Sequence, residues 1–287
     1  MSTSVPTVSL RSGATTVAIP ALGFGVWQVP DDAVEAAVIT ALESGYGHID
    51  TARIYGNESG VGRALATARA AGMPSEDVFV TTKVWNEDHR GVRAAFDASM
   101  ARLGLDTLDL FLIHWPAPAG GAYVDAWREL VALRDEGRVR AIGVCNFHIP
   151  HLQRLADEVG ELPAINQIEL HPYLQQAELR AFHAENGIVT ESWSPLASGK
   201  QVLDDPVIAE VAAKHGVTPA QAIIRWHLDL GAVVIPKSVT PSRIRENIDV
   251  FGFALDADDL AAFGVLDRGM RTGPNPDEFN LHAVNSR

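Results

Sequence analysis

The feature that most constrains the fold is a regular alternation of short apolar runs with amphipathic helical stretches. Eight runs read as strands: Leu22–Gly25, His48–Asp50, Val78–Lys83, Leu108–His114, Val139–Cys145, Ile165–Glu169, Ile188–Trp193 and Val233–Pro236. Helical patterns lie between them, among them Ala33–Glu43, Val92–Leu103, Ala126–Glu136 and Leu179–Asn186. Strands that alternate with helices favour a parallel sheet.

Eight such units in 287 residues fit a closed barrel best. We therefore predict an α/β protein, a (βα)8 TIM barrel, with residues 1–287 forming a single domain. A short hairpin is expected to precede it (Thr7–Leu10 with Thr15–Ile19), and residues 267–287 are expected to form a loop over the barrel mouth. The alternative is an open doubly wound sheet, which usually binds a dinucleotide through Gly-x-Gly-x-x-Gly. The segment GFGVWQ at 23–28 lacks the third glycine, which weighs against it.

Several helices carry terminal signals. Asp205 and Thr240 each precede a proline, which predicts a capping side chain followed by proline at the first helical position. Thr218 with Gln221 three residues later predicts a capping box. The glycines that follow helical stretches suit left-handed ends: Gly45, Gly104, Gly137 and Gly187.

Composition limits the partners and the compartment. The formal net charge is −13, which argues against nucleic acid or an anionic membrane as a partner. The single cysteine, Cys145, excludes an intrachain disulfide, and the N-terminus MSTSVPTVSL shows no signal-peptide pattern. No apolar run approaches the ~18 residues of a membrane span. We expect a cytoplasmic protein.

Three consecutive strands end in ionisable residues: Asp50, Lys83 and His114, with Tyr55 in the loop after Asp50. In a barrel, reactive groups lie at these carboxyl ends of the strands. Each residue alone is as compatible with a structural salt bridge or a core histidine as with function. The four together, on neighbouring strands, favour a functional site.

A carbonyl that accepts a hydride also needs a proton at its oxygen. Tyr55 can donate one, and a nearby Lys83 ammonium is expected to lower its pKa from about 10. Asp50 would keep that ammonium charged and oriented. A neutral His114 would donate to the carbonyl oxygen and polarise it.

Seven motifs carry a resemblance to a known family. They are DTARIYGNE (50–58), TKVW (82–85), LIHWP (112–116), GVCNF (143–147), NQIELHP (166–172), SWSPL (192–196) and IPKSVT (235–240). In this order they resemble the aldo-keto reductases along essentially the whole chain, with a prokaryotic branch related to 2,5-diketogluconate reductases nearest. The resemblance implies NADPH-dependent reduction of aldehydes and ketones, with Tyr55 as donor, Lys83 and Asp50 tuning it, and His114 orienting the carbonyl. It implies no metal.

The resemblance also implies a track for NADPH across the barrel mouth. Trp193 is expected to stack on the nicotinamide, and Lys237, Ser238 and Arg243 to hold the 2′-phosphate, with helix N–H groups near Thr240 also facing an anion. Two cations at that point favour NADPH over NADH. The full cofactor set is Asn146, Gln167, Trp193, Leu196, Ile235, Lys237, Ser238, Val239, Thr240, Arg243 and Asn247.

The expected substrate wall consists of Phe24, Trp27, Trp85, His114 and Trp115, completed by variable loops and the tail around Phe279. Aromatic walls suit an apolar or amphipathic carbonyl, and the substrate itself stays open among aldehydes, α-dicarbonyls and keto-sugars or keto-acids.

The chain departs from the family pattern at Cys145, where serine is usual, and at Gly47, where a larger residue is usual. A thiol is a weak donor, which puts one carboxamide contact in doubt.

Two other functions compete with carbonyl reduction. A metal-dependent hydrolase could use Asp50 and His114, but no strand end shows the clustered ligands such sites need; His148 and His151 fall in a loop-to-helix region. A barrel that holds NADPH as a redox sensor would turn over slowly or not at all, and the intact set of four residues argues against it. The family is often monomeric, and we expect a monomer.

Overall fold

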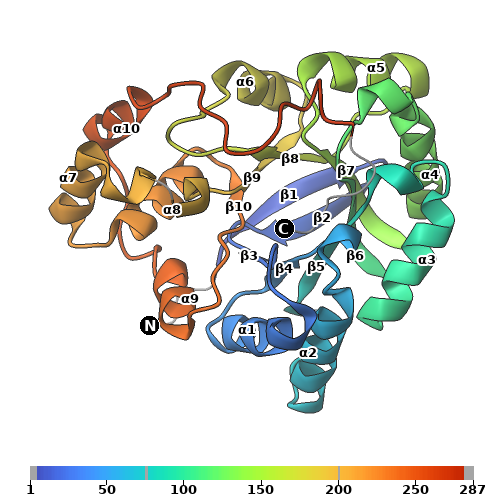
Figure 1. Cartoon of the computed structure of the whole chain (residues 1–287), viewed down its shortest axis with the longest axis horizontal. Coiled ribbons are helices and arrows are strands. Elements are labelled where there is room, and N and C mark those ends of the chain that lie inside the picture. The colour runs from blue at the N-terminus through green and yellow to red at the C-terminus, as the bar shows by residue number, and fades with distance from the viewer. Residues whose placement is uncertain (1–4, 75–76, 200, 281–287) are drawn as a thin grey trace.

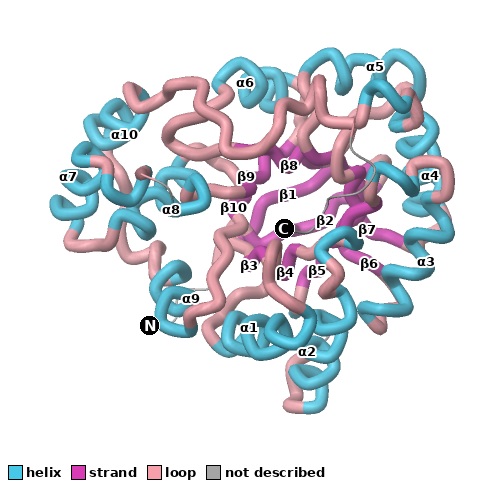
Figure 2. Tube along the Cα trace, viewed as in Figure 1, coloured by secondary structure: helices cyan, strands magenta, loops and turns pink. Residues whose placement is uncertain are grey.

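The computed structural model describes residues 5–74, 77–199 and 201–280, and it is a barrel of parallel strands inside a ring of helices (Figures 1 and 2). The barrel sheet runs in the order β10-β9-β8-β7-β6-β5-β4-β3. Its strands are β3 (Phe24–Gly25), β4 (His48–Asp50), β5 (Phe79–Val84), β6 (Leu108–Ile113), β7 (Val139–Cys145), β8 (Ile165–Glu169), β9 (Val189–Trp193) and β10 (Val233–Val234). The barrel prediction is confirmed, with strand bounds that shift by up to two residues.

Ten α-helices are described in these ranges. They are α1 (Asp31–Glu43), α2 (Glu58–Ala70), α3 (Val92–Leu103), α4 (Tyr123–Asp135), α5 (Ile149–Val159), α6 (Ala177–Glu185), α7 (Pro206–His215), α8 (Pro219–Asp229), α9 (Pro241–Ile248) and α10 (Ala257–Gly264). In Figure 2 they surround the strands, so the strands are covered from outside by helices. None of the described helices has the length and apolarity needed to cross a membrane.

The first and last strands close the barrel. Val234 donates its N–H to Ala21 and accepts from Gly23, at 2.9 Å each, and Leu22 forms a parallel bridge to Val234. The predicted hairpin is also present, as β1 (Thr7–Ser12) and β2 (Thr15–Pro20). Its apolar face packs with residues at the amino ends of the barrel strands, in a cluster that includes Leu10, Val17, Ile19, Phe79, Ala141, Ile165 and Val233. The hairpin therefore closes one end of the barrel and leaves the carboxyl ends of the strands as the mouth.

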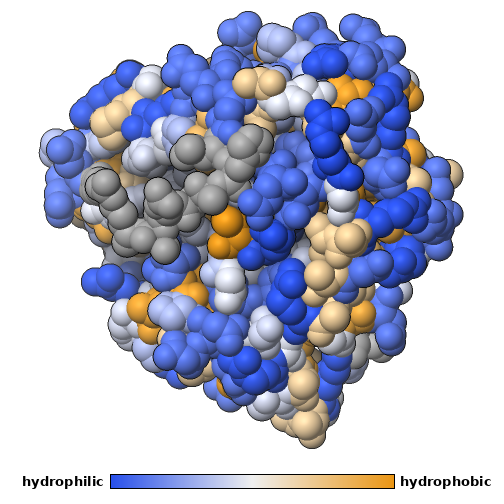
Figure 3. Space-filling view, turned by 45° about the vertical axis from the view of Figure 1, so that its right-hand side comes forward, coloured by the Kyte–Doolittle hydropathy of each residue, from blue (hydrophilic) through white to orange (hydrophobic). Residues whose placement is uncertain are grey.

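Strand alternation sorts the side chains into an inner and an outer set. Ile49 and Phe24 face the helices and belong to the large core cluster, whereas Leu110 and Leu112 of β6 face the barrel interior. The functional residues of the strands share the inward parity. Polar residues cover most of the face shown in Figure 3, with apolar ones scattered among them.

Two of the three capping predictions are confirmed, and the third is wrong. Asp205 accepts a hydrogen bond from Val207 N at 2.9 Å, and Thr218 forms the expected box with Gln221. Thr240 precedes α9, but its side chain forms no cap bond; its own N–H donates instead to Ser238 Oγ at 3.1 Å. The side-chain cap is therefore absent, although Pro241 takes the first helical position as predicted. The predicted glycine ends have positive φ, as at Gly104 (65°).

Candidate active site

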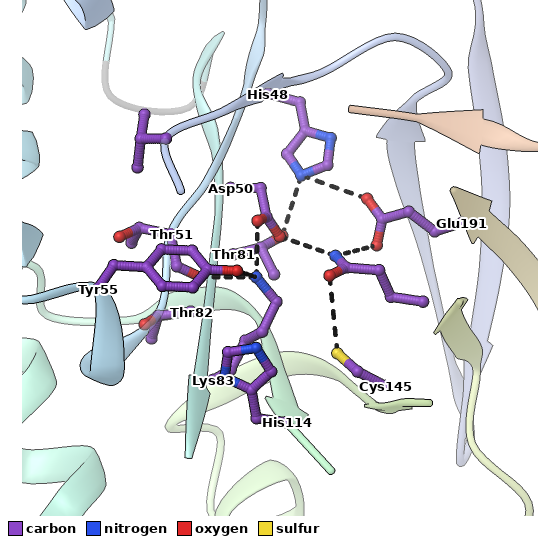
Figure 4. Close-up of polar contacts among 12 residues, drawn as sticks. His48, Asp50, Thr51, Tyr55, Thr81, Thr82, Lys83, His114, Cys145 and Glu191 are labelled. Atoms are coloured by element: carbon purple, nitrogen blue, oxygen red, sulfur yellow. Dashed lines mark hydrogen bonds and ion pairs between the residues drawn. The ribbon is translucent and has the colours of Figure 1, made fainter. Parts of the chain in front are cut away.

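A buried ion pair lies at the mouth of the barrel. Lys83 Nζ on β5 donates to Asp50 Oδ1 on β4 at 2.6 Å, and neither side chain is more than 2% exposed (Figure 4). The two strands are adjacent and parallel, with Asp50 opposite Thr81, so Lys83 reaches across from one layer higher. Because an unpaired charge in this position would be strongly unfavourable, each residue requires the other.

Tyr55 joins the pair from the loop. The chain leaves β4 at Asp50 and turns through a short 3-10 helix, Arg53–Tyr55, which ends at Gly56 with φ 68°. This turn brings the Tyr55 hydroxyl to 3.4 Å from Lys83 Nζ. A third bond, 2.9 Å to the carbonyl oxygen of Thr51, completes the coordination of the ammonium. The structure therefore brings together the predicted residues of the loop and the two strands.

Burial changes the acidity of this group from what the sequence suggested. Burial raises the pKa of the Tyr55 phenol, and the Lys83 ammonium opposes that shift without reversing it. The expected net lowering of the Tyr55 pKa was wrong, because desolvation outweighs the Lys83 charge. For Lys83, burial lowers the pKa, but the neighbouring groups, Asp50 foremost, together raise it by more, and the net shift is upward. Tyr55 is thus a protonated phenol beside a permanent cation at neutral pH.

His114 contacts the Tyr55 ring. It follows β6 directly, and its ring centre is 5.6 Å from that of Tyr55 and 5.1 Å from that of Trp85, both edge-on. Burial and the Lys83 charge hold the pKa of His114 well below its usual value. The imidazole is therefore neutral, as the sequence analysis expected, and its Nδ1 has no hydrogen-bond partner among the described residues.

Asn146 and Trp193 meet at the mouth. Asn146 follows β7 with φ 63°, a left-handed conformation, and its Oδ1 accepts from Trp193 Nε1 at 2.8 Å. The Asn146 amide also donates to the carbonyl oxygen of His114 at 3.1 Å. Trp193 is partly exposed at the end of β9, and its ring lies edge-on to Trp115 at 6.4 Å. The predicted partners of the nicotinamide end thus lie next to His114.

Gln167 is buried inside the barrel. It is 2% exposed, and its Nε2 donates to Asp50 Oδ2 and to Glu191 Oε2 at 2.9 Å each. Its Oε1 accepts a weak bond from the Cys145 thiol at 3.8 Å. Burial raises the pKa of that thiol far above its usual value, so Cys145 is a neutral weak donor. The other departure, Gly47, lies at the amino end of β4, away from the mouth.

A cleft of about 520 Å³ runs from Trp27 to α9. Of the predicted cofactor residues it is lined by Leu196, Lys237, Ser238, Arg243 and Asn247. Sequence reasoning missed the rest of the lining: Gln28, Ser194, Pro195, Ser198, Gly199, Leu203, Thr218, Pro219, Ala220, Pro236 and Glu246. Most of these lie in turns, in short 3-10 helices or at the start of α8, and Glu246 lies near the end of α9, so their shared role is visible only from their position in space.

The three remaining residues of the predicted cofactor set do not line the cleft. Ile235 is buried, and Val239 and Thr240 are exposed beside Ser238. Within the described chain, neither Lys237 nor Arg243 forms a salt bridge, so two exposed cations face the cleft without a carboxylate partner. The first turn of α9 also lacks a side-chain cap. This end of the cleft therefore fits a phosphate group.

Of the predicted aromatic wall, Trp85 lies edge-on to His114, Trp115 contacts Phe279, and Trp27 stands half-exposed at the cleft (48%). Phe24 is a correction. Gly25 pairs with the inward Asp50, so Phe24 pairs with Ile49 and points outward, where its ring packs edge-on to Tyr46 at 5.6 Å. Phe24 is thus a core residue between strand and helices and does not reach the mouth.

The described part of the tail, 267–280, has no helix or strand and crosses the mouth, as predicted (red in Figure 1). Glu169, at the end of β8, accepts from Thr272 N at 2.5 Å and from Gly273 N at 3.2 Å. Farther along, the Phe279 ring lies 4.4 Å from that of Trp115. The tail thus adds Phe279 to the wall, as expected, and residues 281–287 lie outside the described chain. Its anchor Glu169 was missed, although a carboxylate in an apolar strand end was a signal for it.

Within the described ranges, no three His, Cys, Asp or Glu side chains group as ligands for a metal ion. His148 and His151, considered above for a hydrolase, contact the tail instead: His148 Nδ1 lies 2.9 Å from Asp277 Oδ1, and His151 Nε2 lies 3.6 Å from it. The metal-dependent hydrolase therefore has no ligand set to rest on in this part of the chain.

Comparison with known proteins agrees with this geometry. The sequence profile described as "Aldo/keto reductase family" matches residues 21–267. Methylglyoxal reductase DkgA of Yersinia pestis is 54% identical over 278 residues, 96% of this chain and 98% of that protein. The protein of the same name from Escherichia coli K12 is 55% identical over 262 residues, 91% of this chain and 94% of its own length.

Solved structures agree as well. A point mutant of Gox0644 in complex with NADPH has a TM-score of 0.90 at 45% identity, covering 96% of this chain and 99% of its own. The Bombyx mori aldo-keto reductase AKR2E4 in complex with NADP has a TM-score of 0.88 at 34% identity, covering 96% and 97%.

Proposed function

Because the chain belongs to the aldo/keto reductase family, we propose that its NADPH-dependent reduction of aldehydes and ketones takes its proton from Tyr55. The observation that carries this assignment is the buried chain of contacts from Asp50 to Lys83 (2.6 Å) and from Lys83 to Tyr55 (3.4 Å). No other phenol among the described residues contacts an ammonium group in this way.

Each residue of the site has a distinct task in the reduction. When bound, NADPH supplies the hydride. The Tyr55 hydroxyl donates the proton to the carbonyl oxygen, and the Lys83 ammonium stabilises the phenolate left behind. Asp50 holds the ammonium charged and aimed at Tyr55. The neutral His114 offers an N–H to the same oxygen, orients the carbonyl and stabilises the negative charge that develops on it.

The residues present fit the cofactor at both ends. Lys237 and Arg243, two cations without carboxylate partners, suit the 2′-phosphate of NADPH, and Asn247 and Leu196 line the same cleft. At the mouth, the partly exposed face of Trp193 is available for stacking, and its N–H is held by Asn146. We assign Gln167 to the nicotinamide carboxamide only through its Oε1, because its Nε2 already donates to Asp50 and Glu191.

For the substrate, we propose small aldehydes and α-dicarbonyls. Two relatives carry the name methylglyoxal reductase, at 54% and 55% identity. The contacts at the mouth support the same class, because the Phe279 ring packs against Trp115 and Trp85, and Trp85 in turn contacts His114. A bulky keto-sugar would have to displace this ring.

A turnover assay tests the proposal. Purified enzyme is given NADPH or NADH with methylglyoxal, glyoxal, simple aldehydes, a 2-keto acid and a keto-sugar. We expect carbonyl-dependent loss of NADPH absorbance, highest kcat/KM for the α-dicarbonyls, and a preference for NADPH of at least tenfold. Tight NADPH binding without turnover of any carbonyl would favour the redox sensor instead, and a keto-sugar preference would overturn the substrate class.

We also propose a cytoplasmic monomer. The lone thiol of Cys145 is buried and has no second cysteine to pair with, which suits a reducing compartment. The face in Figure 3 shows scattered apolar residues rather than a continuous apolar patch, which suits a monomer. Sedimentation at micromolar concentration should give the mass of one chain, 30.8 kDa; a dimer mass would contradict the proposal.

A further inference from the structure

Glu191 is a buried carboxyl to which the assignments above give no task. It lies on β9 between the inward positions of Val189 and Trp193, and it is fully buried. Most charged side chains in such a position are paired. Glu191 contacts no ammonium or guanidinium within the described chain; the nearest basic group is His48, whose Nε2 lies 3.9 Å from Glu191 Oε1.

The contacts of Glu191 lead to Tyr55 through a continuous chain of hydrogen bonds. One Glu191 oxygen accepts from Gln167 Nε2 at 2.9 Å, and the second hydrogen of the same nitrogen goes to Asp50 Oδ2 at 2.9 Å. The other Asp50 oxygen holds Lys83. Figure 4 shows Glu191 and His48 on one side of this group and Tyr55 and His114 on the other. The Gln167 amide is thus clamped between two carboxyls and cannot rotate without losing one.

The charges around Glu191 favour its protonated form. The groups that face this cluster are His48 and Asp50 on β4, Lys83 on β5, Cys145 on β7 and Tyr55 from the loop. Only Lys83 is a cation, and it contacts Asp50. Burial, and next the charge of Asp50, raise the pKa of Glu191 to about 8. Burial lowers the pKa of His48 to about 3, so His48 supplies no compensating charge at neutral pH.

We propose that Glu191 is a positioning residue for the reduction: in its neutral form it holds Gln167, which in turn holds Asp50 and therefore keeps Lys83 directed at Tyr55. This inference rests on the proposed role of Tyr55 as proton donor. It assigns to Glu191 no contact with substrate or cofactor.

The arrangement has a consequence for pH dependence. When Glu191 loses its proton, a second buried negative charge appears beside the single Lys83 ammonium. That charge disfavours the phenolate of Tyr55 and makes the phenol a weaker acid, and it also disfavours the negative charge that develops on the substrate oxygen. The rate of reduction should therefore be high while Glu191 is protonated and fall as the pH rises through about 8.

Three variants test the proposal. Glu191→Gln keeps an acceptor for Gln167 but has no proton to lose, Glu191→Ala removes the acceptor, and Ser192→Ala is the control. Ser192 is the next residue on the strand, is equally buried, and its Oγ has no partner within the described chain. The measurement is kcat for methylglyoxal reduction from pH 6 to 9.5, normalised to the concentration of NADPH-binding sites from a tryptophan-fluorescence titration.

We expect Glu191→Gln to match the wild type within about twofold at pH 6.5 and to lack the decline through pH 8. Glu191→Ala should have roughly tenfold lower kcat than the wild type at pH 6.5 and should also lack the decline through pH 8, and Ser192→Ala should follow the wild type. A role in folding alone would lower the melting temperature of both Glu191 variants but leave the pH profile of the folded sites unchanged. That result, or a Glu191→Gln profile identical to the wild type, overturns the inference even if Glu191→Ala does not fold.

The Tyr55→Phe variant separates this test from the proposed function. If Tyr55→Phe is inactive and the Glu191 variants behave like the wild type, only the positioning role fails. If Tyr55→Phe turns over normally, the proton donor itself is wrong, whatever the Glu191 variants do.

Discussion

Lys83 and Asp50 form a buried ion pair whose two atoms, Nζ and Oδ1, are 2.6 Å apart at the mouth of the barrel. The pair explains why two charges interrupt apolar strands at neighbouring positions: neither would be tolerated without the other. It also joins stability to function, because the ammonium that neutralises Asp50 is the one that faces Tyr55.

Removal of the Asp50 charge should therefore damage both folding and activity. Asp50→Asn leaves the Lys83 ammonium buried without its counter-ion, so we expect a loss of about 3–5 kcal/mol in unfolding free energy and at least a tenfold fall in kcat. Urea unfolding and steady-state kinetics measure the two effects. The surface pair Arg128–Asp125 has the same 2.6 Å distance but is 47% and 68% exposed, so Asp125→Asn is the control and should change stability by less than about 1 kcal/mol. Equal effects of the two variants would contradict the argument.

The preference for NADPH should depend on the two cations of the cleft. Lys237→Ala or Arg243→Ala removes a charge from the phosphate end, and we expect KM for NADPH to rise about tenfold or more while KM for NADH changes little, since a charge-assisted bond contributes about 1.5–3 kcal/mol. Arg245→Ala is the matched control, because Arg245 is an exposed arginine of the same helix that does not line the cleft. Parallel increases for NADPH and NADH would show that the two cations do not read the 2′-phosphate.

Acid should destabilise the fold through His227. Burial lowers the pKa of His227 to about 3, whereas the unfolded chain takes up that proton near pH 6.5. Between these values the unfolded state binds more protons, so stability is present above about pH 6.5 and is lost as the pH falls. From pH 8 to 5.5 the wild type should lose about 1.4 kcal/mol more than His227→Gln does. Urea unfolding of both proteins at the two pH values measures the difference; equal losses would mean that His227 is not held neutral.

The corrected position of Phe24 predicts a separation of stability from specificity. Phe24 packs against Tyr46 in the core, so Phe24→Leu should lower the unfolding free energy by about 1 kcal/mol and leave KM for every carbonyl unchanged. Phe279→Ala should do the reverse, because Phe279 lies on Trp115 at the mouth. We expect its KM for methylglyoxal to change at least threefold with little loss of stability. A changed KM for any carbonyl in Phe24→Leu would show that Phe24 belongs to the substrate wall.

Much of the fold could be predicted because it follows from local patterns. The alternation of strands and helices and the glycine and capping signals depend on a few neighbouring residues, and β4, β7 and β8 begin and end where predicted. That Asp50, Lys83, Tyr55 and His114 lie together could also be predicted, because parallel strands bring their carboxyl ends to one edge. Their chemical roles, and the extent of residues 1–287 as one domain, stay predictions.

The rest of the site could not be predicted, because it depends on where side chains point and how deeply they are buried, and the local sequence pattern does not give either. Phe24 was misplaced because the strand parity was not read against Asp50, and the net effect on the Tyr55 pKa was wrong because burial could not be weighed against the Lys83 charge. Glu191 was overlooked although its inward parity with Trp193 was visible in the sequence. Thr240 occupies the predicted position before α9, but its side chain forms no cap bond, and the structure offers no reason that the local sequence could have shown.

The central claim is that Tyr55 gives the proton, and Tyr55→Phe tests it most directly. The substitution removes only the hydroxyl that lies 3.4 Å from Lys83 Nζ, so the ring and its edge-on contact with His114 remain. The measurement is kcat for carbonyl reduction together with the NADPH dissociation constant from tryptophan fluorescence. We predict a fall in kcat of about 10²–10⁴-fold, the usual contribution of a general acid, with NADPH affinity within twofold of the wild type. Turnover near the wild-type rate with NADPH still bound would contradict the account.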